Sequence, residues 1–219
     1  MPRALFEKSG NAIFISHLDL MRLFQRAFKR AGLPLTHTQG YSPRPSVSIA
    51  LPLSVGISSC CELLDFDLTD CDAEFPEMVS RLNEVLVEGI RILDIYPEGS
   101  KIKNLAFLDC EVCLEYDTGI PCGAKQQIEE LFSRPCLTVE KSGKNGITTQ
   151  DIIPMIRNFK VAEAGGHTLY LSARICCQNP SLNPNQIGAA INHYLPELKP
   201  DFVSCKRIEL YDHNDKIFR

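Results

Sequence analysis

Apolar residues recur with helical spacing between Ser16 and Ala31, and strand-like runs flank this stretch on both sides. The apolar positions of the helical stretch share one side, at Leu20, Met21, Phe24, Ala27, Phe28 and Ala31. This period predicts an amphipathic helix of about four turns. Ser16 followed by Asp19 predicts where the helix starts, and Gly32 followed by Pro34 predicts where it ends.

The pattern also orders the rest of the first hundred residues. It predicts strands at residues 3–8, 47–51, 60–68 and 90–96 and a second helix at 73–86, with residues 12–15 continuing in extended form. The resulting order is β-α-β-β-α-β. That order is typical of a ferredoxin-like unit, in which two helices cover one face of a four-stranded antiparallel sheet.

The second half of the chain follows a looser version of the same order. We predict strands at residues 105–116, 136–140, 159–164, 168–177 and 202–211, and helices at 123–132, 149–158 and 183–194. Residues 97–101 are typical of a linker. The predicted fold class is therefore α+β, with tandem ferredoxin-like (βαββαβ) units built on antiparallel sheets. The domains are expected at residues 1–97 and 104–219, and residues 212–219 are expected to be mobile.

Charge is distributed unevenly along the chain. The net charge is −4, but residues 1–50 contain seven Lys or Arg and two Asp or Glu, so this segment has a charge of +5 and the remainder −9. A basic N-terminal segment on an acidic body indicates a local anionic partner, and it argues against indiscriminate coating of nucleic acid.

Four cations of the predicted helix, at Arg22, Arg26, Lys29 and Arg30, fall on the side opposite to its apolar residues. The loop that follows contains His37, Gln39, Tyr41 and Arg44, and Arg44 stands between two prolines that stiffen its backbone. Such side chains suit phosphates, sugars and bases. Two plainer interpretations stay open. The helix cations could serve only to interact with the helix dipole, and the loop could be a turn whose polar groups bond with one another.

The sequence predicts neither a membrane segment nor a metal site. No run approaches the roughly 20 apolar residues that span a bilayer, and the N-terminus lacks the plan of a secretory signal, so we expect a cytoplasmic protein. Cys110 and Cys113 lie on a predicted strand, where residues three apart face opposite ways. We therefore expect buried, inert thiols and no cofactor.

Residues 14–68 resemble the start of an uncharacterised bacterial domain that is fused to, or encoded beside, radical SAM proteins. The matching positions are Ser16 to Asp19, Arg22, Arg30 to Pro34, Gln39-Gly40 and Leu51 to Gly56. Members often have Phe-Asn-Pro-His-Pro where this chain has Tyr41-Ser42-Pro43-Arg44-Pro45, so an imidazole is replaced by Arg44.

This resemblance implies a radical SAM protein as partner. The chain itself has no C-x-x-x-C-x-x-C motif that could hold a [4Fe–4S] cluster. The resemblance therefore favours a non-catalytic accessory or substrate-presenting role over an enzyme.

Our first functional hypothesis is that the substrate is RNA, such as a tRNA or rRNA awaiting modification. The helix cations would neutralise phosphates, Arg44 would clamp a phosphate or stack on a base, His37 and Tyr41 would stack, and Gln39 would contribute to sequence readout.

Two alternatives come from other classes of function. The first is a metal-independent RNA endonuclease similar to CRISPR-repeat processing enzymes, with His17 as general base and Lys29 or Arg44 stabilising the phosphorane. The second is a protein-interaction module without RNA binding, because arginine is also frequent at protein interfaces.

Overall fold

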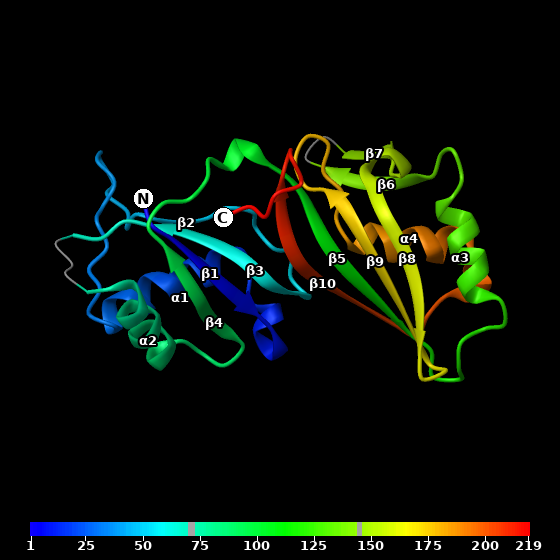
Figure 1. Ribbon diagram of the computed structural model, residues 1–219, viewed down its shortest axis with the longest axis horizontal. Coiled ribbons are helices and arrows are strands. Elements are labelled where there is room, and N and C mark those ends of the chain that lie inside the picture. The colour runs from blue at the N-terminus through cyan, green and yellow to red at the C-terminus, as the bar shows by residue number, and fades with distance from the viewer. Residues whose placement is uncertain (70–72, 144–145) are drawn as a thin grey trace. The chain divides into compact units, whose positions relative to one another are not determined.

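The structure is a computed structural model that describes residues 1–69, 73–143 and 146–219. The chain divides into two compact units. The first unit consists of Met1–Asn104 together with Ile217–Arg219, and the second unit is Leu105–Lys216. Each unit combines helices with a mostly antiparallel sheet (Figure 1).

The sheet of the first unit consists of β1 (Arg3–Lys8), β2 (Val47–Ile49), β3 (Ile57–Phe66) and β4 (Ile90–Tyr96). The strands lie in the order β4-β1-β3-β2, and each neighbouring pair is antiparallel. α1 (His17–Arg30) and α2 (Phe75–Val85) pack on one face of this sheet, because their buried residues form one core with alternate strand residues (Figure 1). The predicted helices and strands of this unit are confirmed, with ends that differ by a few residues.

Two aromatic pairs fix α1 on the sheet. Phe24 meets Phe6 edge to face with ring centroids 4.9 Å apart, and Phe28 packs on Phe66 at the same centroid distance. All four rings are fully buried. Aromatic pairs in this arrangement contribute about 0.5–1.5 kcal/mol each beyond the area they bury, so they fix which side of α1 faces the core.

The extended segment predicted at residues 12–15 is wrong. Residues Gly10–Phe14 form the short 3₁₀ helix η1, in which the Ala12 N–H donates to the Ser9 carbonyl and the Ile15 N–H donates to the Ala12 carbonyl. Ala12 is buried in the same core as α1. The apolar pattern of this short segment fits a strand as well as a helix, and its packing in the core decides in favour of the 3₁₀ helix.

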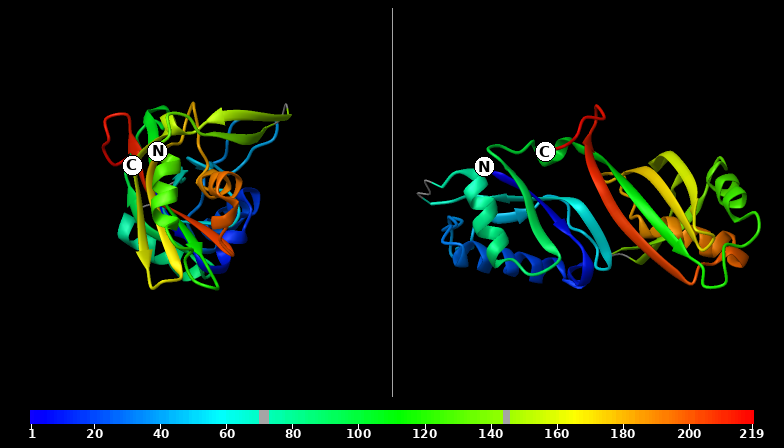
Figure 2. Two further views of the ribbon diagram at one scale, coloured as in Figure 1. Left: turned by 90° about the vertical axis from the view of Figure 1, so that its right-hand side faces the viewer. Right: turned by 60° about the horizontal axis from the view of Figure 1, so that its bottom comes forward.

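The second unit has a similar sheet with an inserted hairpin. β5 (Leu105–Glu115), β8 (Ile156–Ala164), β9 (Thr168–Cys176) and β10 (Phe202–Asp212) lie in the order β10-β5-β9-β8, while β6 (Thr138–Gly143) and β7 (Gly146–Asp151) pair only with each other. α3 (Ala124–Phe132) packs on β8, and α4 (Asn185–Tyr194) packs on β5 and β10 (Figure 2). Short 3₁₀ helices complete the chain as η2 (Ile102–Asn104), η3 (Ile153–Met155) and η4 (Pro196–Leu198).

The helix predicted at residues 149–158 is also wrong. This stretch consists of the end of β7, the short η3 and the start of β8. Thr149 lies opposite Glu140 in the β6–β7 hairpin, so the segment is extended because of a pairing partner that local sequence does not reveal. Pro154 has no N–H to donate in a longer helix, and the 3₁₀ turn ends after Met155.

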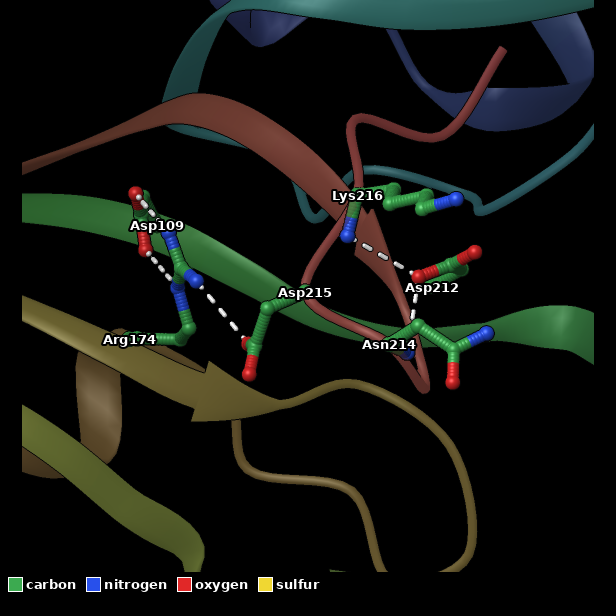
Figure 3. A network of polar contacts seen from close by, with 6 residues as sticks. All are labelled: Asp109, Arg174, Asp212, Asn214, Asp215 and Lys216. Carbon is green, nitrogen blue, oxygen red and sulfur yellow. Dashed lines mark hydrogen bonds and ion pairs between the residues drawn. The ribbon is translucent and has the colours of Figure 1, made fainter.

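Arg174 belongs to a network of polar contacts in the second unit (Figure 3). Its guanidinium donates two hydrogen bonds to the Asp109 carboxylate, at 2.7 and 3.0 Å, and one to Asp215 at 2.9 Å. It also lies 3.6 Å from the ring centroid of Tyr211. In the turn after β10, the Asp212 carboxylate accepts from the N–H groups of Asn214 and Lys216. The strand acid Asp109 thus has a structural partner.

The last residues of the chain pack into the first unit. The Phe218 side chain is buried, and the Arg3 guanidinium lies 5.3 Å from the centre of its ring. Arg3 also donates to the Asp65 carboxylate, at 2.6 and 2.9 Å, and to the Ser100 carbonyl at 2.9 Å. The expectation that residues 212–219 are mobile is therefore wrong. Residues 217–219, which the sequence pattern places in the second domain, belong to the first unit.

Replacing Phe218 by Ala should lower the free energy of unfolding by about 3 kcal/mol, because a buried ring is removed and a cavity remains. Ile217→Ala is the matched control, since the neighbouring Ile217 side chain is 58% exposed and should change stability little. Urea unfolding of both variants measures the difference. Equal stabilities for the two variants would contradict the structural role of Phe218.

Candidate nucleic-acid interface

Local signals define both ends of α1, as the sequence predicts. At the start, the Ser16 hydroxyl accepts from the Asp19 N–H at 3.2 Å and donates to the Asp19 carboxylate at 2.7 Å. At the end, the N–H groups of Gly32 and Leu33 donate to the carbonyls of Lys29 and Phe28. This is a Schellman motif, in which Gly32 adopts a left-handed conformation with a φ of +68°.

All four predicted helix cations line one depression of about 650 Å³, which we call the basic depression. Ile15, Asp19, Leu23 and Val87 complete its described lining. The cations come together because residues 22, 29 and 30 each lie three or four positions from residue 26 along the helix. The buried residues Phe24, Ala27 and Phe28 hold the opposite side of α1 against the sheet.

The four cations differ in what they already contact. Arg22 pairs with Asp19 at 3.0 Å, and Arg30 donates to the Val85 carbonyl at the C-terminal end of α2 at 2.7 Å. Hydrogen bonds from Ser16 and then Arg22 lower the pKa of the Asp19 carboxyl. Within residues 1–69, 73–143 and 146–219, no side chain or carbonyl forms a hydrogen bond or ion pair with the charged groups of Arg26 and Lys29. These two are the cations available to an external anion.

The loop after α1 forms a narrow hairpin. His37 and Pro45 form an antiparallel bridge, the Thr38 N–H donates to the Arg44 carbonyl at 2.8 Å, and the Arg44 N–H donates to the Thr38 hydroxyl at 3.1 Å. At its tip Tyr41 is fully exposed, and Gln39 and Arg44 are exposed as well. The plainer interpretation thus holds for the N–H and the hydroxyl of Thr38, which bond within the turn.

A second depression, the loop cleft, was not predicted from the sequence. It measures about 570 Å³ and lies between the end of α1 and the hairpin, with a lining of Gln25, Lys29, Gly32, Leu33, Pro34, Leu35, His37 and Pro45. Lys29 lines both depressions. Of the predicted loop residues, His37 lines this cleft, whereas Gln39, Tyr41 and Arg44 line neither depression. The apolar residues Leu33 to Leu35, next to a helix end, are the signal that could have indicated a cleft.

The structure separates His17 from the cations with which it would have to act. His17 is the first residue of α1, and Lys29 is twelve residues further along the same helix. At a rise of 1.5 Å per residue the two are about 18 Å apart along the axis. The Arg44 loop adjoins the Lys29 end, since His37 and Pro45 line the loop cleft. His17 therefore lies too far from Lys29 for the two to act on one phosphate.

The sulfur and acidic side chains do not form a competing site in the part of the chain that the structure describes. Within that part no group of three or more His, Cys, Asp or Glu could hold a metal ion. Cys110 is buried on β5 and Cys113 is half-buried three residues further, as strand alternation predicts. Burial raises the pKa of the Cys110 and Cys177 thiols to about 12, which makes them poor nucleophiles. Cys71 lies outside the described residues.

None of the described helices is long and apolar enough to cross a bilayer.

Comparison with known sequences assigns the chain to a family. A family model described as an uncharacterized protein conserved in bacteria matches residues 2–184. The chain belongs to this family, designated DUF2344. A search of curated proteins finds no match.

Among solved structures, the fold is similar to a chain in the crystal structure of a Cbf5-Nop10-Gar1 complex. The TM-score is 0.50 at 9% sequence identity, and the match covers 95% of this chain. This chain spans 48% of the length of that chain. At this identity the likeness concerns the fold alone.

The conformation of Gly32 determines how the hairpin follows α1. Replacing Gly32 by Ala should lower the free energy of unfolding by about 1–2 kcal/mol, because a residue with a Cβ is strained at this φ. A new Cβ would meet no closer atom than the Arg81 Nη2 at 3.7 Å, so the cost comes from the backbone. Gly32→Asn should lose less, since Asn tolerates this conformation better. Thermal unfolding compares the two variants, and a larger loss for Asn would contradict the backbone explanation.

Proposed function

We propose that this protein is an RNA-binding accessory protein that uses the basic depression and the neighbouring hairpin to hold a polyanionic substrate. The observation on which the proposal depends is that Arg26 and Lys29 project into one depression with Arg22 and Arg30 and have no partner among the described residues. Paired cations would offer an incoming phosphate little, whereas exposed cations that neutralise phosphates release the counterions condensed on the nucleic acid, which favours binding. Of the seven cations in residues 1–50, Arg3 and Lys8 are buried, but the other five are exposed and support the same conclusion.

We also propose that both units are ferredoxin-like. In each unit the sheet places the last strand beside the first, then the third and then the second, if the β6–β7 hairpin is treated as an insertion. This order, together with antiparallel pairing and two helices, supports the ferredoxin-like interpretation. Such a sheet leaves α1 at the surface with one side free for a ligand.

The proposed partner is a radical SAM enzyme that modifies tRNA or rRNA, and the support for it is the sequence resemblance of residues 14–68. This chain would then present RNA, and the enzyme would supply the cluster chemistry that this sequence lacks. The endonuclease alternative loses its support because His17 lies at the far end of α1 from Lys29.

Alanine at Arg26 and Lys29 together should weaken binding of a small structured RNA and reduce the dependence of log K on log salt by roughly 0.7–0.9 for each cation removed. Fluorescence anisotropy titrations over a salt series measure both quantities. Arg91→Ala is the control, because Arg91 is an exposed cation of the same unit that alternates with the core residues Ile90 and Ile92 and so faces away from α1. An unchanged slope in the double variant, or an equal change in Arg91→Ala, would contradict the proposed interface.

Co-purification separates RNA binding by Arg26 and Lys29 from the protein-interaction alternative. A tagged chain purified from its source bacterium should retain a protein with a C-x-x-x-C-x-x-C motif. It should also retain RNA that ribonuclease removes, and the Arg26 and Lys29 variants should retain less of that RNA. If the retained partner survives ribonuclease but is lost from the Arg26 and Lys29 variants, the basic depression meets protein. Absence of any iron–sulfur partner would remove the radical SAM part of the proposal.

A further inference from the structure

The loop cleft differs in chemistry from the basic depression next to it. Pro34, Leu35 and Pro45 supply apolar surface around the fully buried Leu33, and none of the described residues in its lining is acidic. Gln25, Lys29 and His37 are the described lining residues with polar side chains. An apolar cavity with a few polar groups and a volume of about 570 Å³ is typical of a site for a small ring system.

The walls of this cleft are held by backbone contacts. The hairpin wall is closed by the His37–Pro45 bridge and by the bonds between Thr38 and Arg44, and the helix wall ends in the Schellman motif at Gly32. A wall that is ordered before binding costs little conformational entropy when a ligand enters. The cleft is therefore formed before a ligand arrives.

Lys29 connects the two surfaces. Because it lines both depressions, a phosphate held at Lys29 would place the attached nucleoside at the mouth of the loop cleft. A base that is stacked and paired in a duplex is not available to such a cleft, whereas a base of a single strand can turn out and stack on an imidazole.

Resting on the proposed RNA binding, we propose that the loop cleft accepts one unstacked nucleobase, so that the first unit selects single-stranded over double-stranded RNA. His37 stacks on the base, Pro34, Leu35 and Pro45 cover its apolar surface, and the Gln25 amide can donate to and accept from its edge. Lys29 holds the adjoining phosphate. The site thus combines a stacking surface with a cationic groove.

The test compares three ligands of the full-length protein at one salt concentration. These are a labelled single-stranded RNA, the same strand in a duplex, and unlabelled AMP as competitor. We expect the single strand to bind more tightly than the duplex. His37→Ala should reduce that preference roughly tenfold, because a stacked base is lost, and should leave the salt slope unchanged, because no phosphate contact is removed.

Two control variants test whether His37 acts by stacking on a base. His37→Phe keeps a stacking ring and should retain the preference, and His213→Ala removes an exposed imidazole of the second unit and should change nothing. Equal binding of single strand and duplex by the native protein, or an unchanged preference in His37→Ala, overturns the base cleft while the Arg26 and Lys29 effect still supports RNA binding. Displacement by AMP at the concentration of the RNA would assign the cleft to a free nucleotide and overturn this inference. Failure to bind either RNA overturns the proposed function and this inference together.

Discussion

The packing of two aromatic residues of α1 on the sheet determines what the first unit presents to solvent. Phe24 against Phe6 and Phe28 against Phe66 fix the rotation of the helix about its own axis. With that rotation fixed, Arg26 and Lys29 have to face outward, since a helix turns about 100° per residue. The hydrophobic core and the charged surface are thus consequences of one sequence period.

Two cations of the second unit have partners of a kind that Arg26 and Lys29 of the first unit lack in the described part of the chain. In the second unit Arg174 is held by Asp109, Asp215 and the Tyr211 ring, and the guanidinium of Arg157 lies 4.1 Å from the ring centre of Phe107. Such residues already have the carboxylates and rings that an external ligand would have to replace. In the first unit Arg26 and Lys29 have no such partner among the described residues. Counting charges would not reveal this difference, which depends on what each side chain contacts.

Sequence reasoning succeeded where the determining contacts are local. The ends of α1 follow from Ser16 and Gly32, and the grouping of its cations follows from helical spacing. It failed where distant partners decide. The stretch after β6 is a strand because Thr149 pairs with Glu140, and the chain end is ordered because Phe218 meets Arg3. The loop cleft was missed for the same reason, because it needs the approach of Pro45 to His37 across a turn.

The position of Phe218 also has a consequence for the order of events during synthesis. Strands β1 to β4 leave the ribosome long before Phe218 is made, and N-terminal domains generally begin to fold first. Until the whole second unit has been translated, the guanidinium of Arg3 lacks the ring that covers it. The nascent first unit is therefore incomplete, and its maturation waits for the ribosome to pass residue 218.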